Sequence, residues 1–373
     1  MILTVSLSAF FWQVSKVQVA TELETKRNTV ISDYGEEASR ARMSLVTEKL
    51  LDQIFESKKI AESLVEQVSV VLHNERMLEE DKREQMIKLS KDALHASSVI
   101  LGIYTNFVED ALGDDSKFIG REDYASNEKG RFTPYFTAAG ETGIHTQIMT
   151  EKDFEVEETD QFGYEDNHWY TCVFKIKRPC LVQPYKDFVQ GKEYFMISLA
   201  IPVFSLDKRE VVGVVGVDIS LRNISKMLSV LDRTVFNGEA EITLLNKHGQ
   251  IIGDSDHPKT YGRLIGEVSS TPERYNRLSA AGVPGSVTDP DTGEMLLYTP
   301  FKLIDNETVL ELFAKIPLES IESNIEALNG HAVEIYSGNV FKFIQAGLVV
   351  LLLFLVGLWY FFRRYLKRPD DDR

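Results

Sequence analysis

The first part of the chain has the spacing of apolar residues that is typical of long amphipathic helices. Between residues 16 and 95 there is no Pro, and Gly35 is the only Gly. Apolar residues recur at steps of mostly three and four, namely at Met43, Val46, Leu50, Ile54, Ala61, Leu64, Val68 and Val71. This spacing places them on one face of a helix. An unbroken helix of this length would measure about 120 Å, so we expect a break near residues 73–74.

After residue 96 the pattern changes from the period of a helix to that of a strand. Runs rich in β-branched and aromatic residues, such as VILGIY, YFMISLAIPVF and VVGVVGVDI, are separated by Gly, Asp and Lys clusters. We expect a turn at 205–210 between two of these strands and a short helix at 221–228.

Two hairpins of this region have similar sequences. MISLAIPVFSLDKREVVGVVGVDISLRNI and MLLYTPFKLIDNETVLELFAKIPLESI each read as strand, Pro, polar turn and strand, followed by a short leader that ends in Ile. Two copies of one hairpin predict two similar α/β modules in tandem. The alternative is that they share only what all antiparallel hairpins share.

Both ends of the chain are apolar. Residues 343–362 form a run without charge that is long enough to cross a bilayer at about 1.5 Å per residue; the alternative is a buried core helix. Basic residues follow this run, which predicts that 363–373 is cytoplasmic. Residues 1–15 are apolar over a shorter stretch, and we interpret them as a partial first transmembrane segment rather than the remnant of a signal peptide.

The charge and the motifs narrow the classes of partner. The formal net charge is −16, without a large basic block, so nucleic acid is not an expected partner. The sequence has no CxxC, HExxH, GxSxG or P-loop motif, and we therefore expect no metal site, no cofactor and no enzymatic activity. The two cysteines, Cys172 and Cys180, form either a disulfide, which would persist outside the cytoplasm, or two free thiols.

The strand VVGVVGVDI places a carboxylate among valines. Side chains alternate between the faces of a strand, so Asp218, Gly216, Val214 and Val212 are expected on one face. A buried carboxylate needs a cation or several donors, and Gly216 would leave room beside it. We interpret this as an ammonium-binding pocket. The alternative is that Asp218 caps the helix near Leu221 or pairs with an internal Lys or Arg.

Residues of other segments can complete this pocket. Trp169 and Tyr170 can offer aromatic faces to an ammonium group or an aliphatic chain, or can each belong to the core. Tyr185 and Asp187 would add a hydroxyl and a second carboxylate. Arg131 either grips an anion or holds the fold through its own ion pair.

The order of several motifs resembles that of a double Cache (dCache) sensor domain of bacterial transmembrane receptors. The motifs are LGIYTNFVEDALGD, GRFTPYF, HWYT, QPYKD and VVGVVGVDISL, and the resemblance extends from about residue 40 to 325. It implies an α+β fold in which a long N-terminal helix precedes two tandem PAS-like modules with antiparallel sheets, flanked by transmembrane helices. It also implies that a small molecule binds the membrane-distal module, and that the signal reaches a cytoplasmic output domain of the chemotaxis, histidine kinase, cyclase or phosphatase type.

The expected organisation combines these observations. Its parts are a partial transmembrane segment (1–15), a helical region (16–95), a membrane-distal ligand-binding module (96–228), a membrane-proximal module (229–325), a connecting helix (326–342), a transmembrane helix (343–362) and a cytoplasmic tail (363–373). The ectodomain would be periplasmic or extracellular on the inner membrane. The long apolar stripe further predicts a homodimer through the N-terminal helix.

The resemblance also implies which residues surround the ligand. In the amino-acid-sensing branch of the family, an Arg grips the ligand carboxylate and a final Asp takes the amine, with a Tyr, a Trp-Tyr pair and a later Tyr around them. The matching positions here are Trp169, Tyr170, Tyr185 and Asp218. Asn167 stands at the position of the Arg and Phe162 at that of the first Tyr. An amide cannot replace a bidentate, cationic guanidinium, so we expect a cationic amine before an amino-acid-like ligand. The alternative class is a structural or protein-interaction ectodomain without a small-molecule ligand.

Overall fold

The computed structural model describes residues 2–138, 143–156, 158–289, 291–304, 309–321, 323, 354, 356–361 and 363, and of residues 2–32 the backbone alone. Residues 36–318 form one compact unit, and residues 1–35 with 319–373 form a second. No helix within the described residues combines the length and the hydropathy of a membrane crossing. The connecting helix predicted at 326–342 lies outside the described residues, as do the tail at 364–373 and most of the transmembrane helix predicted at 343–362.

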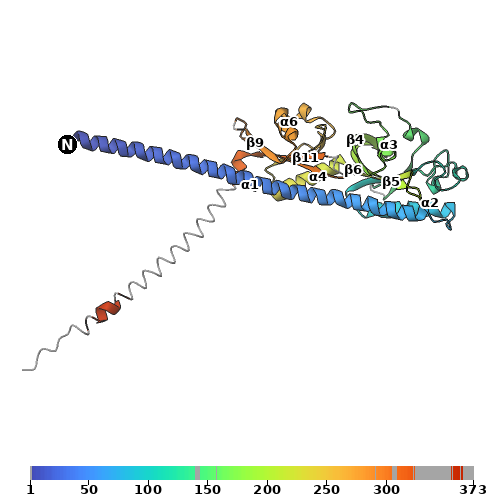
Figure 1. Ribbon diagram of the computed structural model, residues 1–373, viewed down its shortest axis with the longest axis horizontal. Coiled ribbons are helices and arrows are strands. Elements are labelled where there is room, and N and C mark those ends of the chain that lie inside the picture. The colour runs from blue at the N-terminus through green and yellow to red at the C-terminus, as the bar shows by residue number, and fades with distance from the viewer. Residues whose placement is uncertain are drawn as a thin grey trace, which may run out of the picture. The chain divides into compact units, whose positions relative to one another are not determined.

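The helical pattern of the first part of the chain forms two helices, α1 (Ile2–Leu72) and α2 (Glu79–His95). The break predicted near residues 73–74 is confirmed. Within the compact unit, α1 runs alongside both β-sheets (Figure 1). All eight residues of the apolar stripe are at most 7% exposed, so the chain's own modules cover the face that suggested a homodimer. A homodimer through α1 stays a prediction.

Two antiparallel sheets define two modules (Figure 1). The first module has the strand order β3-β2-β1-β6-β5-β4 and the second β8-β7-β11-β10-β9. Their strands are β1 (Ile100–Phe107), β2 (Pro134–Thr137), β3 (His145–Ile148), β4 (Cys180–Val189), β5 (Lys192–Phe204), β6 (Val211–Ser220), β7 (Glu241–Asn246), β8 (Ile251–Asp254), β9 (Gly285–Asp289), β10 (Glu294–Lys302) and β11 (Val309–Pro317). The α+β class with antiparallel sheets is confirmed.

Short helices join and cover these strands. They are α3 (His168–Ile176), α4 (Leu221–Leu231), α5 (Ile265–Val268) and α6 (Pro272–Ala281), with 3₁₀ turns at Asp115–Phe118, Glu122–Tyr124 and Glu151–Phe154 and a π turn at Asp232–Phe236. Because α4 continues across residues 228 and 229, the two modules share a helical connection, and the domain limits set from the sequence stay predictions.

The two similar hairpins occupy the same place in the two sheets. In the first module β5 and β6 lie between β1 and β4, and in the second β10 and β11 lie between β7 and β9. Each hairpin closes with the same number of turn residues, since Phe204 pairs with Val211 and Lys302 pairs with Val309. The prediction of two similar modules in tandem is therefore confirmed at the level of strand topology.

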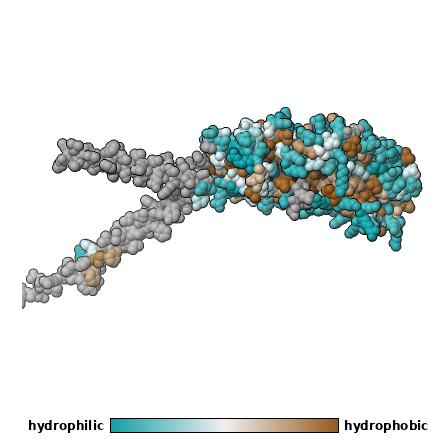
Figure 2. Space-filling view, turned by 45° about the horizontal axis from the view of Figure 1, so that its top comes forward, coloured by the Kyte–Doolittle hydropathy of each residue, from teal (hydrophilic) through white to brown (hydrophobic). Residues whose placement is uncertain are grey.

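The first sheet separates two apolar clusters. On one face, Ile103 and Val217 belong to the cluster that packs on Leu64 and Val68 of α1. On the other face, Val214 belongs to the cluster around α3. On the outer surface of the compact unit, hydrophobic residues are interspersed among hydrophilic ones (Figure 2).

The strand β6 departs from regular alternation at its start. Val203 pairs with Gly213 but Phe204 pairs with Val211, so Val212 is the extra residue of a bulge. A bulge shifts the following side chains by one position. The prediction that Val212 shares a face with Asp218 is therefore wrong: Val212 packs against the α1 side of the sheet, and Val211 against the α3 side.

The two cysteines form a disulfide. Cys172 of α3 is bonded to Cys180 at the start of β4, across a sequence separation of 8 residues. The bond links α3 to the edge strand β4. The sequence left open whether the cysteines form a disulfide or stay free thiols, and the structure shows the disulfide.

The packing of α1 on the first module generates a stability prediction. Leu64→Ala should lower the free energy of unfolding by about 2–5 kcal/mol, since it opens a cavity in a core where the leucine is 1% exposed. Val70→Ala on the same helix, where the valine is 73% exposed, should change it by about 0.5 kcal/mol or less. Denaturant unfolding measures both, and equal effects would contradict the placement of the helix.

Candidate functional site

The candidate site begins with Asp218, near the end of β6. The residue is 2% exposed, because β6 is an inner strand flanked by β1 and β5. Ser198 Oγ donates a hydrogen bond to Asp218 Oδ1, and Tyr185 Oη donates a second one to the same oxygen at 3.2 Å. Both partners are neutral hydroxyls. Within the described residues, no ion pair involves this carboxylate.

The surroundings of Asp218 perturb its protonation. Burial raises the pKa of Asp218 to about 7, although the hydroxyls of Ser198, Tyr135 and Tyr185 favour the ionised form. The carboxylate of Asp187 adds a further increase, and burial also raises the pKa of Asp187 itself. A carboxyl group that titrates near neutral pH inside a fold is typical of a functional site.

Two tyrosines that the sequence analysis did not select stand beside Asp218. A Cβ atom built at Gly216 would lie 1.9 Å from Cζ of Tyr104, so this ring fills the room that we expected beside the glycine. The expectation of free space at Gly216 is therefore wrong, because the glycine makes room for a cross-strand tyrosine. Tyr135 covers Gly102 in the same way, and its buried hydroxyl has no hydrogen-bond partner of good geometry.

A cavity of about 240 Å³ lies on the α3 side of the first module. The residues that line it are Met149, Lys152, Asp153, Glu155, Asp166, Asn167, Trp169, Tyr185, Lys186 and Asp187. Four predicted site residues are among them, and Tyr185 connects the cavity to Asp218. Four carboxylates against two lysines give the lining a negative charge, which suits a cationic ligand.

Asn167 and Trp169 form one wall of this cavity. Asn167 precedes α3 and is 2% exposed; its Nδ2 donates to the carbonyl oxygen of Phe154 at 2.8 Å, whereas its Oδ1 is buried without a hydrogen-bond partner. A buried acceptor without a partner costs about 1–3 kcal/mol. The Trp169 ring stands edge-on to Tyr104 at 5.1 Å between centroids, and the Tyr104 hydroxyl donates to the Trp169 carbonyl oxygen.

Two other predicted residues lie away from the cavity lining. The Tyr170 hydroxyl accepts a hydrogen bond from Arg131 Nη2 at 3.1 Å. Phe162 stacks on His248, which follows β7 in the second module, at 4.6 Å between ring centroids. The structure thus brings together Asn167, Trp169, Tyr185, Asp187 and Asp218, and places Tyr170 and Phe162 in contacts of the fold.

The guanidinium of Arg131 is held by contacts within the fold. Its guanidinium pairs with Glu151 at 2.9 Å, donates to the Phe107 carbonyl oxygen and lies over the Phe154 ring at 4.2 Å. Of the two alternatives for this residue, the structure has the internal ion pair. The guanidinium therefore does not replace the one that Asn167 lacks.

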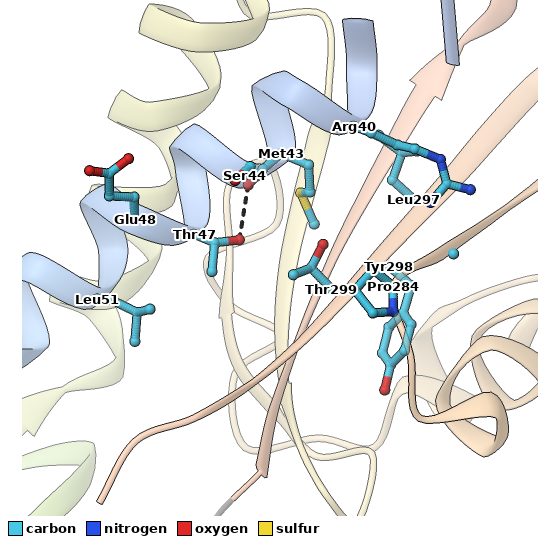
Figure 3. A pocket seen from close by; sticks show the side chains of 11 residues that line it. Arg40, Met43, Ser44, Thr47, Glu48, Leu51, Pro284, Leu297, Tyr298 and Thr299 are labelled. Atoms are coloured by element: carbon cyan, nitrogen blue, oxygen red, sulfur yellow. Dashed lines mark hydrogen bonds between the residues drawn. The ribbon is translucent and has the colours of Figure 1, made fainter. Parts of the chain in front are cut away.

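Other cavities also lie in the compact unit. One of about 320 Å³ shares Asp166, Tyr185 and Lys186 with the candidate site. Another, of about 450 Å³, lies between α1 and the second module, with Met43 and Thr47 facing Tyr298 and Thr299 (Figure 3). It contains none of the residues predicted to bind a ligand.

Comparison with known proteins gives the class of this fold. Residues 103–226 match the family model described as the methyl-accepting chemotaxis protein-like, first PDC sensor domain. The methyl-accepting chemotaxis protein TlpQ of Pseudomonas aeruginosa is 26% identical over 283 residues, which are 75% of this chain and 39% of TlpQ. The chain thus spans well under half the length of this relative.

Solved structures share the fold. The periplasmic sensory domain of the Campylobacter jejuni chemoreceptor Tlp1 has a TM-score of 0.55 at 12% identity and covers 74% of this chain and 93% of its own. A structure named methyl-accepting chemotaxis protein X has a TM-score of 0.56 at 22% identity, with coverages of 78% and 99%. The extracellular domain of the putative histidine kinase mmHK1S-Z3 has a TM-score of 0.55 at 20% identity, with coverages of 80% of this chain and 97% of its own.

The fold and the family match make this chain similar to the sensor domains of chemoreceptors and histidine kinases. Over residues 103–226 the chain matches a PDC sensor module, and over most of its length it has the fold of solved periplasmic and extracellular sensor domains. The resemblance predicted from the sequence is confirmed.

The burial of Asp218 predicts a pH dependence of stability. The pKa of Asp218 in the folded chain, about 7, lies above the ordinary value of about 4. Its protonated form therefore stabilises the folded state; this contribution is fully present below about pH 4 and is lost as the pH rises through about 7. Asp218→Asn, which stays neutral, should remove this loss.

Denaturant unfolding at several pH values measures the effect. The stability of the unsubstituted chain minus that of Asp218→Asn should fall by on the order of 2–4 kcal/mol between pH 4 and pH 8. Asp207→Asn, in the exposed turn between β5 and β6, should give no such slope. A difference that does not vary with pH would show that Asp218 titrates as an ordinary surface carboxyl group.

Proposed function

We propose that the first module binds a small cationic amine in the cavity beside Asp218, and that the chain is the sensor region of a membrane-embedded signalling receptor. The observation that carries this proposal is a buried carboxylate held by neutral hydroxyls alone. Ionised and buried without a cation, such a group is costly. An ammonium ligand would supply the counter-ion that the fold lacks.

The cavity suits an amine better than an amino acid. Its lining carries more carboxylates than ammonium groups, and the Asn167 Oδ1 atom is an acceptor in need of a donor. The nearby guanidinium of Arg131 is held by Glu151, so it cannot grip a ligand carboxylate. Trp169 adds an aromatic wall that favours a cation or an aliphatic stem. The site residues proposed are Asn167, Trp169, Tyr185, Asp187 and Asp218.

A route for the signal leads from the cavity to the second module. Tyr185 contacts Asp218 and lies two residues after Gln183, whose Oε1 accepts a hydrogen bond from Asn246 Nδ2 at 2.8 Å. Binding that moves Tyr185 would act on this contact. A ligand shifts the receptor only through its different affinity for two conformations, and the β4 bulge between Val182 and Tyr185 is where β4 can adjust.

The remaining parts of the receptor are proposed from its relatives. The similarity to the chemoreceptor TlpQ supports an inner-membrane location, a periplasmic ectodomain and a cytoplasmic output domain, of which chemotaxis signalling is the first candidate. The homodimer through α1 and the transmembrane segments at 1–15 and 343–362 belong to the same proposal. The chain itself would not be an enzyme.

One observation favours the alternative function. Tyr104 fills the space over Gly216, as expected for an ectodomain that binds another protein and holds no small molecule. In that case the 240 Å³ cavity would accept no ligand, and the binding experiment below would give no saturable signal.

Calorimetric titration of the 373-residue chain with small primary amines, their alcohol analogues and α-amino acids tests the proposal. An amine should bind saturably, and at 100 times its Kd it should stabilise the fold by about 2.7 kcal/mol. Below about pH 7 the affinity should fall roughly tenfold per pH unit, because protons compete for Asp218. Asp218→Asn should abolish binding, and Trp169→Ala should weaken it about tenfold.

Two variants serve as controls for these substitutions. Asp207→Asn removes an exposed carboxylate and Phe188→Ala an aromatic ring of β4 that is 59% exposed, and neither should change the affinity. Amine binding that survives in both Asp218→Asn and Trp169→Ala would place the ligand elsewhere in the chain.

A further inference from the structure

The two modules can be compared residue by residue through their hairpins. Counting pairs from the two turns places Pro202 and Pro300 at equivalent positions of β5 and β10. The same count makes Asp218 of β6 equivalent to Lys315 of β11. The comparison extends to the neighbouring inner strand of each sheet: Asp218 pairs with Gly102 of β1, and Lys315 pairs with Glu241 of β7.

At these positions the charges of the two modules are reversed. Where the first module has the carboxylate of Asp218, the second has the ammonium group of Lys315. Where the first has Gly102, the second has the carboxylate of Glu241. One strand further out, Tyr135 pairs with Tyr104, and the equivalent pair is Asp254 with Thr243. The second module thus holds a cation and two carboxylates at the position of the candidate ligand site.

These groups are in contact. Lys315 Nζ forms a short ion pair with Glu241 Oε2. His257 Nδ1 lies 3.3 Å from Glu241 Oε1 and 3.7 Å from Asp254 Oδ1, and Asp254 is 2% exposed. Burial lowers the pKa of Lys315, but the ion pair with Glu241 and the charges of Glu294 and Asp254 outweigh it, so that the pKa is raised. Lys315 is therefore a charged ammonium group over a wide pH range.

The covering helix completes the correspondence. In the second module α6 contacts β9 and β10, as α3 contacts β4 and β5 in the first. Tyr275 of α6 packs on Phe313 with tilted rings, 4.8 Å between ring centroids, and Phe313 is the equivalent of Gly216. Burial, together with the carboxylates of Glu241 and Asp254, raises the pKa of Tyr275. Two carboxylates and an ammonium group thus meet in one site, and the ammonium group comes from the strand that also carries the Phe313 ring.

We propose that the ammonium group of Lys315 acts as a built-in ligand of the second module. It occupies a carboxylate site, formed by Glu241 and Asp254, at the position equivalent to the proposed ligand site of the first module. The second module is therefore permanently occupied and needs no external amine. The first module, which has no lysine at this position, depends on a molecule from solution. The ion pair between Lys315 and Glu241 is independent of whether the first module binds an amine.

Removal of the internal ligand should expose the site. Lys315→Ala deletes three methylene groups and the ammonium group, which together correspond to n-propylammonium. In the full chain this change should lower the Tm by about 2–6 °C, because Glu241 and Asp254 lose their counter-ion. n-Propylammonium chloride should restore at least half of the loss with a saturable concentration dependence, whereas 1-propanol and sodium chloride should not. Hydrogen exchange of β7 and β11 should show the recovery in the second module.

Three comparisons separate this site from other effects. The same titration of the unsubstituted chain measures binding of n-propylammonium to the first module. Evidence for the second site is the Tm increase of Lys315→Ala in excess of that of the unsubstituted chain. Lys302→Ala removes an exposed lysine of the same hairpin and should neither lower the Tm nor add a response to the amine. The double variant Glu241→Gln/Lys315→Ala lacks the Glu241 carboxylate and should lose the Tm increase with n-propylammonium. Because it has no unpaired Glu241 charge, it also serves as the folded reference if Lys315→Ala alone folds poorly.

Two results would overturn the proposal. One is a response of Lys315→Ala to n-propylammonium no larger than that of the unsubstituted chain. The other involves the ligand atoms of Glu241, Asp254 and His257, which lie within 4.8 Å of one another. If Ca²⁺ or Zn²⁺ stabilised the unsubstituted chain and Asp254→Asn removed that effect, the group would be a metal site and not a site filled by Lys315.

Discussion

The constraint on which the first module depends is a carboxylate buried without a cation. Asp218 lies on an inner strand, and among the described residues only hydroxyl groups donate hydrogen bonds to it. Because burial disfavours the ionised form, the pKa of Asp218 is raised to about 7. A cation that enters the neighbouring cavity would favour the ionised form, so that ligand binding and proton release are linked. In the receptor that we propose, the free energy of binding would come from pairing this charge with a cation that the described residues do not supply.

The second module shows how the same architecture behaves when the charge is satisfied internally. Lys315 and Glu241 occupy adjacent inner strands at positions equivalent to Asp218 and Gly102. The two modules therefore share a strand order but differ in whether their central charge has a partner within the chain. A gene duplication followed by divergence of these positions would produce one module that responds to a ligand and one that is fixed.

Much of the fold could be predicted from the sequence, because it depends on local patterns. The stripe of α1, the break after Leu72 and the repeated hairpins all come from spacing and turn composition. Four residues selected from the sequence, Asn167, Trp169, Tyr185 and Asp187, line one cavity, and their role in ligand binding stays a prediction. The rest depends on register between distant strands, which no local pattern reveals. The filling of Gly216 by Tyr104 and the bulge that turns Val212 away are both of this kind.

The central claim concerns the charge of Asp218, and its pKa can be measured directly. A carbon-13 NMR titration of the Asp218 carboxyl group, assigned by comparison with Asp218→Asn, would follow its ionisation in the 373-residue chain. The account predicts a pKa near 7 in the free protein and a value lower by at least one unit when a saturating amine is bound. An ordinary pKa near 4 in the free protein, or one that a bound amine leaves unchanged, would contradict it.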